Sequence, residues 1–175
     1  MARRSSSFRG DLPVTDPDAD ADTTTVRRAT SADSAALRRL QGALDEPAPE
    51  LLDAALSGVV GDLFVAVDGA PVGYLLAVDG APSPLDAHLD TDAAASTHVA
   101  ELVVSPPARR NGHASALLAT LCSTYPTATV TLTVAADNEA ARSLYDRFGF
   151  EVVRRLPGFF EDASGLLLAR RPRAE

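Results

Sequence analysis

The stretch that decides the fold is Val103-Val104-Ser105-Pro106-Pro107-Ala108-Arg109-Arg110-Asn111-Gly112-His113-Ala114, which reads as a strand, a glycine-containing turn and the start of a helix. The free N–H groups of a first helical turn point outward, and the helix dipole favours negative charge there. Gly112 and Ala114 let a phosphate approach the backbone, and Arg109 and Arg110 add charged donors. The stretch therefore predicts an anion site, although the pattern alone also fits an ordinary tight turn at a helix start.

Regular elements extend from this turn in both directions, from Val26 to Ala169. Apolar alternation and short apolar runs predict strands, and apolar residues at helical spacing predict helices. The expected strands are residues 26–29, 62–67, 71–78, 97–104, 127–134, 150–156 and 165–169, and the expected helices are residues 32–44, 50–56, 114–125 and 138–148. This order predicts an α/β (α+β) domain, in which helices cover the faces of a mixed sheet.

Local signals mark the ends of several elements. Thr30 and Asp33 form part of a capping box before the first helix, and Gly149 is the glycine expected after the last one. Apolar residues alternate with threonines in residues 127–134, which predicts a half-buried strand. Residues 79–96 are proline-containing and irregular, so we expect a long loop there.

Residues 1–25 differ in composition from the rest of the chain. Arginine and serine come first, an aspartate-rich run and threonines follow, and there is little to bury. We expect a disordered acidic tail here. One domain over residues 26–171 follows, and it is long enough to bury a hydrophobic core.

The charge composition argues against some classes of partner. The net charge is −8, and all sixteen basic residues are arginine. No basic face emerges, so we expect no nucleic-acid partner. The carboxylate-rich composition is similar to that of halophilic proteins from cells that hold molar salt, where surface charge keeps a protein solvated. A GC-rich genome produces the same bias, and both explanations stand.

Membrane and metal sites are not expected either. No apolar run approaches the roughly 18 residues of a membrane-spanning helix, and residues 1–10 lack the apolar core of a signal peptide. We therefore expect a cytoplasmic protein. The single Cys122 lies on an apolar helical stripe and is expected to be a buried, inert thiol. The spacing of His88, His98 and His113 fits no metal site.

A second motif follows at residues 138–150, with the sequence NEAARSLYDRFGF. Together the two stretches resemble the signature segments of the GNAT superfamily: a strand ending V-x-P, then R-x-x-G-x-[GA], and later N-x-x-A-x-x-L-Y-x-x-x-G-F. Every fixed position of the last pattern is present. The resemblance spans Glu101 to Phe150 and implies the GNAT fold, a mixed, mostly antiparallel sheet of about six or seven strands flanked by about four helices.

The resemblance implies an acetyl-CoA-dependent N-acetyltransferase that uses no metal. Val103 and Val104 would offer backbone groups to the pantetheine arm, and Asn138 would contact the same arm. Ala114 stands where glycine is commoner, from which we expect weaker coenzyme affinity at most. The residues that would hold the pyrophosphate are Arg109, Arg110, Asn111, Gly112, His113, Ala114 and Ser115.

In such enzymes a primary amine attacks the thioester directly in a ternary complex. Tyr145 matches the family tyrosine that is placed to protonate the leaving thiolate, although a core aromatic also fits its helical position. Glu101 matches a carboxylate that removes the amine proton through water in several members. The alternative for Glu101 is an exposed strand carboxylate paired with an arginine. His98 and His113 are weaker candidates for the base, and His113 is expected to point to solvent.

Residues 156–163, LPGFFEDA, give information about the substrate, because they resemble the hairpin of the protein N-terminal alanine acetyltransferase branch. A tyrosine pair there helps to line the groove for a peptide N-terminus. Here Phe159 and Phe160 take its place without the hydroxyls, and a hairpin packed on the core fits equally well. With Glu101, these are the expected substrate-binding residues.

Three functions follow from these observations. A protein or peptide N-terminal amine is the leading acceptor, and a small metabolite or antibiotic-type amine is the alternative. A non-catalytic module that binds acetyl-CoA and regulates a partner is the third. The expected partners are acetyl-CoA and the amine acceptor, and the protein is expected to be a monomer or a homodimer.

Overall fold

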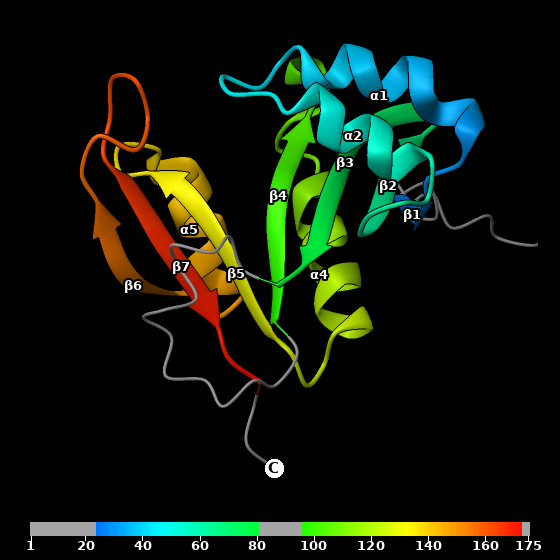
Figure 1. The fold of residues 1–175 in the computed structure, drawn as a ribbon. Coiled ribbons are helices and arrows are strands. Elements are labelled where there is room, and N and C mark those ends of the chain that lie inside the picture. Colours follow the sequence, from blue (N-terminus) through cyan, green and yellow to red (C-terminus); the bar gives the residue numbers. More distant parts are fainter. Residues whose placement is uncertain (1–23, 81–95, 173–175) are drawn as a thin grey trace, which may run out of the picture.

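The computed structural model describes residues 24–80 and 96–172. One seven-stranded sheet runs through this part in the order β1-β2-β3-β4-β5-β7-β6 (Figure 1). Its strands are β1 (Thr25–Arg28), β2 (Asp62–Asp68), β3 (Ala70–Asp79), β4 (Ser96–Val104), β5 (Thr129–Ala135), β6 (Glu151–Leu156) and β7 (Gly165–Arg170). The α-helices of the described residues are α1 (Ser34–Gln41), α2 (Pro49–Leu56), α4 (His113–Thr124) and α5 (Glu139–Arg147), and short 3-10 helices span Ser31–Asp33 and Pro106–Ala108.

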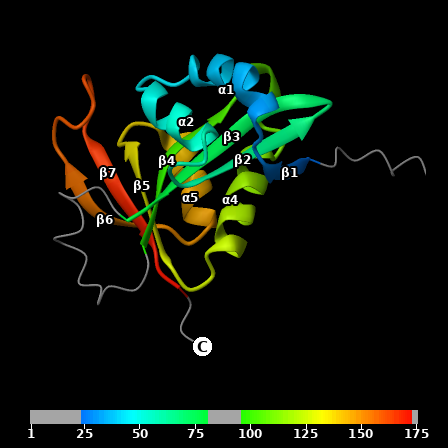
Figure 2. The same ribbon diagram turned by 45° about the vertical axis from the view of Figure 1, so that its right-hand side comes forward.

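The sheet is mixed and mostly antiparallel, as expected from the sequence. Among the described strands only β4 and β5 pair in parallel, and α4 forms the crossover between them. The helices α1 and α2 cover one face of the sheet, whereas α4 and α5 cover the other (Figures 1 and 2). This arrangement confirms the predicted α/β class with helices on both faces.

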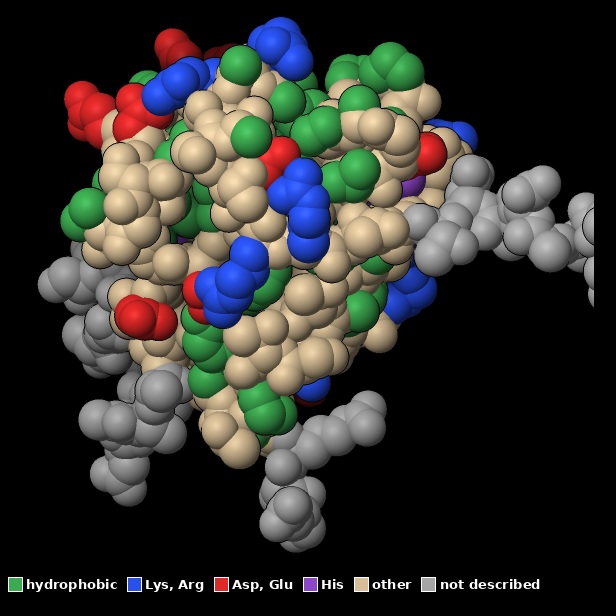
Figure 3. Space-filling view, turned by 90° about the vertical axis from the view of Figure 1, so that its right-hand side faces the viewer, with side chains coloured by type: hydrophobic (Ala, Val, Ile, Leu, Met, Phe, Trp, Pro, Cys, Tyr) green, Lys and Arg blue, Asp and Glu red, His purple; other side chains and the backbone are tan. Residues whose placement is uncertain are grey.

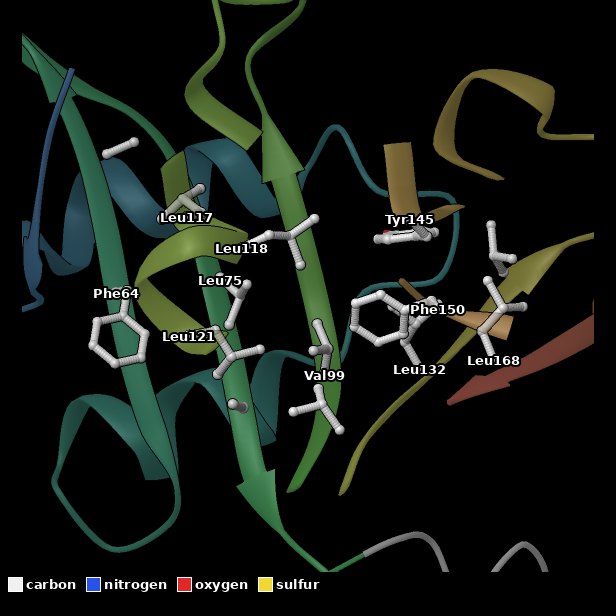
Figure 4. Close-up of a cluster of buried hydrophobic side chains, with 14 of the residues drawn as sticks. Phe64, Leu75, Val99, Leu117, Leu118, Leu121, Leu132, Tyr145, Phe150 and Leu168 are labelled. Carbon is white, nitrogen blue, oxygen red and sulfur yellow. The ribbon is translucent and has the colours of Figure 1, made fainter. Parts of the chain in front are cut away.

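Two hydrophobic cores lie on the two faces of the sheet. On one face Leu37 of α1 and Leu52 of α2 are fully buried against Val65 and Leu76. On the other, Leu117 and other leucines of α4 and the aromatic rings next to α5 pack on the sheet (Figure 4). Each fully buried leucine contributes about 1.5–3 kcal/mol, so both helical layers are held by apolar burial.

The local end signals are present as expected. The backbone N–H of Thr30 donates to Asp33 Oδ2 at 2.8 Å, which completes the capping box. Gly149 has φ 79°, a left-handed conformation that glycine adopts without strain and that closes α5.

The prediction of a half-buried strand at residues 127–134 is wrong. Thr129 and Thr131 of β5 are as buried as Val130, Leu132 and Val134, and Thr133 is half-buried. The alternation of apolar residues with threonines describes the polarity of the side chains and not their burial. β5 lies inside the sheet between β4 and β7, and both of its faces are covered, so Thr129 and Thr131 are buried as well.

Part of the sequence interpretation lies outside the described residues. The predicted acidic tail at residues 1–25 and the predicted loop at residues 79–96 fall there almost entirely. Within the described residues, no helix has the length and apolarity that crossing a membrane requires.

Candidate active site

The two parallel strands diverge at the centre of the sheet. β4 and β5 pair only from Ser96 opposite Thr129 to Val99 opposite Leu132. Beyond Val99, β4 continues beside β3 and β5 continues beside β7 (Figure 1). A bulge at Ala100 accompanies the divergence, because an extra residue bends a strand away from its neighbour. The far half of β4 therefore offers an edge to which an extended ligand can add.

The turn after β4 has the backbone of an anion site. Arg110 and Gly112 both have left-handed φ values, 68° and 82°. The first hydrogen bond that closes on Gly112 comes from Ala116 N at 2.9 Å, so the N–H groups of the preceding turn have no partner inside the helix. A Cβ added to Gly112 meets no atom within 4 Å. Glycine is needed here for its conformation, and the space outside the turn is open to a ligand.

Most of the residues that are predicted to hold the pyrophosphate are exposed or half-buried. Arg109, Arg110, Asn111 and Gly112 are exposed, and Ala114 and Ser115 are half-buried at the start of α4. Arg109 Nε donates to Val104 O at 3.2 Å, so this arginine ties the turn to the end of β4. Val103 is buried against α1 and α2, and Val104 is half-buried.

The prediction that His113 points to solvent is wrong. Its side chain is 1% exposed, Nδ1 lies 2.9 Å from Thr24 Oγ1, and Nε2 lies 3.9 Å from Asp68 Oδ2. The first residue of α4 turns its side chain toward the β1–β3 end of the sheet, on which the helix packs. Only the backbone N–H of His113 is thus placed for a phosphate.

Tyr145 lies between the diverging ends of β4 and β5 (Figure 4). Residues at helical spacing turn this face of α5 inward, and the Tyr145 ring meets Phe150 edge to face, with centroids 5.8 Å apart. Burial raises the pKa of Tyr145 to about 12. Within the described residues its hydroxyl makes no hydrogen bond. The site thus holds a neutral phenol that can donate a proton.

Asn138 caps the helix that carries Tyr145. Its Oδ1 accepts a hydrogen bond from Ala141 N at 3.1 Å, an N-cap interaction. Its amide nitrogen is not used in this cap. Asn138 lies three residues after the end of β5 at Ala135, so this N-cap residue follows the strand at the open end of the divergence.

Glu101 lies on the α1–α2 face of the sheet and is only 4% exposed. Its Oε1 accepts hydrogen bonds from Ala48 N at 2.7 Å and Gln41 Nε2 at 3.0 Å. Its Oε2 accepts from the Tyr74 hydroxyl at 2.7 Å and from Gln41 Nε2 at 3.2 Å. The interpretation as an exposed carboxylate paired with an arginine is therefore wrong.

Tyr74 and Gln41 are residues of this site that the sequence analysis missed. Burial, followed by the hydrogen bond to Glu101, raises the pKa of Tyr74. The available signal was a tyrosine within the apolar stretch at residues 71–78, because a buried tyrosine hydroxyl needs a partner. The identity of that partner was not readable, since Glu101 is 27 residues away.

His98 lies beside the same face of β4. It is 8% exposed, and its Nδ1 lies 2.9 Å from Thr131 Oγ1 on β5, directly across the parallel pair. The imidazole thus joins the two strands just before they diverge.

The β6–β7 hairpin lies at the open end of the divergence. The hairpin and the α1–α2 loop (residues 42–48) flank this end on opposite sides in both ribbon views (Figures 1 and 2). Phe159 is 48% exposed and meets Phe160 edge to face, with centroids 5.0 Å apart. The exposure of Phe159 argues against a hairpin that merely packs on the core.

Other parts of the described surface lack comparable features. A cavity of about 590 Å³ lies away from the divergence, between α5 and the strands β6 and β7. On the side that carries β1 and α4, arginine and acidic side chains are scattered without a continuous basic patch (Figure 3). Among the described residues, no group of three or more His, Cys, Asp or Glu side chains is arranged to hold a metal ion. Cys122 is half-buried, and burial raises the pKa of its thiol.

Known proteins are similar to this chain in sequence pattern and in fold. A model of the acetyltransferase (GNAT) family matches residues 30–150. NAA60 from Arabidopsis thaliana, in complex with a bisubstrate analogue, is 20% identical, with a TM-score of 0.74 over 87% of this chain and 100% of that one. In complex with acetyl-CoA it is 22% identical, with a TM-score of 0.74 over 85% and 98%.

A third similar structure is the ribosomal-protein-S18-alanine N-acetyltransferase from Escherichia coli. It is 21% identical, with a TM-score of 0.69 over 87% of this chain and 97% of that one. At these identities the likeness establishes the fold. No curated protein is similar enough in sequence to count as a match.

Proposed function

The chain belongs to the acetyltransferase (GNAT) family and is an acetyl-CoA-dependent acetyltransferase that acts on amines, and from this premise we propose that its acceptor is the N-terminal amine of a protein or peptide. The observation that carries the proposal is the position of the α1–α2 loop and the β6–β7 hairpin. Both flank the open end of the β4–β5 divergence (Figure 2), and an extended acceptor chain that binds at this end would lie between them.

The geometry of the turn after β4 fits acetyl-CoA. The N–H groups of His113, Ala114 and Ser115 open α4 without a side-chain cap, beside the exposed Arg109 and Arg110. A diphosphate satisfies such donors and is favoured by the helix dipole. The Val103 backbone pairs with Tyr74 of β3, so the edge of β4 that faces away from β3 is offered to the pantetheine arm by Val104, whose carbonyl Arg109 holds in this structure.

Acetyl-CoA supplies an activated acetyl thioester, and the chain supplies position and one proton. Tyr145 keeps its proton at neutral pH, because burial raises its pKa to about 12. A proton held next to a departing thiolate stabilises the charge that develops there. We assign this role to the Tyr145 hydroxyl, which lies where β4 and β5 diverge.

The hairpin residues support a peptide rather than a small acceptor. The exposed ring of Phe159 and the half-buried ring of Phe160 pack edge to face on the β6–β7 hairpin. An aromatic pair offers apolar contact to the first side chains of a peptide. Similar structures bear names of N-terminal acetyltransferases, among them an enzyme named for a ribosomal-protein alanine.

A panel assay tests the proposal. Thiol release from acetyl-CoA is measured in molar KCl with peptides that differ in their first two residues, and with a matched panel of small primary amines. Each peptide is also supplied with a blocked N-terminus and a free lysine. Turnover restricted to peptides with free N-termini supports the proposal. Turnover on blocked peptides or only on small amines overturns it and moves the acceptor to a side chain or a metabolite.

A further inference from the structure

We infer that Glu101 is a positioning residue. Its buried carboxylate holds both ends of the α1–α2 loop against the sheet and so fixes the part of the site where the acceptor binds. It does not take a proton from the amine. The inference rests on the proposed function for the place of the acceptor.

Three donors surround the Glu101 carboxylate, and one of them, Gln41 Nε2, is shared between its two oxygens. Each oxygen accepts two hydrogen bonds, from Gln41 and Ala48 at Oε1 and from Gln41 and Tyr74 at Oε2, at 2.7–3.2 Å. A carboxylate offers about four lone-pair positions. A water molecule that carried the amine proton would have to displace one of these donors, and Gln41 and Tyr74 are themselves buried. A donor displaced inside the protein remains unpaired, which is unfavourable.

The donors come from the two ends of one loop. Gln41 is the last residue of α1, and Ala48 is the N-cap residue of α2. Ala48 has no side chain that could cap the helix, and its own N–H is directed to Glu101. The single carboxylate thus holds the start and the end of residues 42–48 to β4, while Tyr74 of β3 holds the carboxylate in place.

This arrangement assigns Glu101 to the geometry of acceptor binding. Fixing both ends of a loop in advance reduces the entropy that ligand binding must remove. Loss of the hydrogen bonds to Glu101 therefore weakens acceptor binding. Acetyl-CoA binding and the Tyr145 hydroxyl are not affected, because the turn before α4 and Tyr145 lie on other elements. The acceptor ammonium group then loses its proton to solvent, so activity rises with pH as the neutral amine forms.

The kinetic test compares Glu101→Gln, Gln41→Ala and Tyr74→Phe, with the acceptor that the panel identifies. We expect the acceptor KM to rise about fivefold or more in all three variants. We expect kcat to stay within about threefold and the acetyl-CoA Kd within about twofold of the wild-type values. Arg38→Ala is the matched control, because it breaks an exposed ion pair between α1 and α2 that does not involve Glu101, and it should leave all three constants unchanged.

The pH profile separates positioning from proton transfer. In Glu101→Gln, kcat/KM should keep the wild-type pH dependence. It should rise as the peptide ammonium group loses its proton near pH 8. A fall in kcat of about 100-fold or more in Glu101→Gln alone, with an unchanged acceptor KM and normal Gln41→Ala and Tyr74→Phe variants, overturns the inference.

Amide hydrogen exchange supplies a readout that needs no acceptor. Residues 42–48 should exchange faster in Glu101→Gln and in Gln41→Ala than in the wild-type protein, and Arg38→Ala should not change them. Unchanged exchange in both variants overturns the inference even if peptides are substrates. Faster exchange in a protein that acetylates only small amines refutes the proposed acceptor and leaves the role of Glu101 supported.

Discussion

The rings of Tyr145 and Phe150 meet edge to face at 62°, with their centroids 5.8 Å apart, across the turn that joins α5 to β6. This contact holds the Tyr145 hydroxyl at the divergence of β4 and β5 by packing alone, since burial is the only cause of its raised pKa. The orientation of the phenol therefore does not depend on the hydroxyl.

That independence makes Tyr145→Phe a clean test of the proton donor. We expect kcat to fall about 100-fold, the usual lower bound for a lost general acid. The acetyl-CoA Kd and the melting temperature should stay unchanged, because the ring remains packed. Thiol release and coenzyme titration measure the two effects. Unchanged turnover would remove Tyr145 from the mechanism.

Gly112→Ala should weaken acetyl-CoA binding. An alanine with φ near 82° is strained by about 1–2 kcal/mol, so the turn relaxes away from the geometry that directs its N–H groups outward. We expect the Kd to rise about 5–30-fold, measured by titration calorimetry. Gly58→Ala is the matched control, because Gly58 also has a left-handed φ, 71°, with open space around it. An equal change in Kd in the control would contradict a specific role for Gly112.

The ion pair between Arg27 and Asp33 should make stability depend on pH. Hydrogen bonds from Arg27 at 2.8 and 2.9 Å lower the pKa of Asp33 from 3.8 to about 2. A carboxyl whose pKa is lowered on folding contributes stability above its unfolded pKa and loses it as the pH falls from about 4 to about 2. Since Arg27 is 43% exposed, solvent screening reduces the contribution to about 1–2 kcal/mol.

Asp33→Asn measures this contribution by urea unfolding. We expect the variant to be less stable than the wild-type protein by about 1–2 kcal/mol at pH 7. The difference should fall as the pH approaches 2 and reach zero only below that pH, where Asp33 is protonated in both states. A difference that is the same at both pH values would assign the loss to packing instead of charge.

Salt dependence tests the interpretation of the acidic composition. With a net charge of −8 and no lysine, we expect the melting temperature to rise as KCl increases from low to molar concentration, because cations screen the repulsion among carboxylates. Calorimetry in matched KCl and NaCl series measures it. A melting temperature that is flat or falls with salt would leave genome composition as the explanation.

The sequence predicted the elements on either side of the active site because their signals are local. The helix from Asn138 to Gly149 carries its own cap, apolar stripe and terminal glycine, and α5 forms there with Asn138 as its N-cap. The conformation of the turn through Gly112 can likewise be predicted from a few neighbouring residues. The roles of the predicted site residues remain predictions, and the experiments above address them.

Where the sequence interpretation was wrong, the deciding neighbour lies far along the chain. Glu101 binds Gln41 and Ala48, which are 60 and 53 residues away, and His113 meets Thr24 across 89 residues. Hydrophobic spacing and capping are properties of a single segment, so the sequence by itself determined the order of elements, the glycine turn before α4 and the helix of Tyr145. Burial and hydrogen-bond partners arise only when distant segments pack, and therefore tertiary structure alone decided that Glu101 is enclosed and that the imidazole of His113 is turned inward.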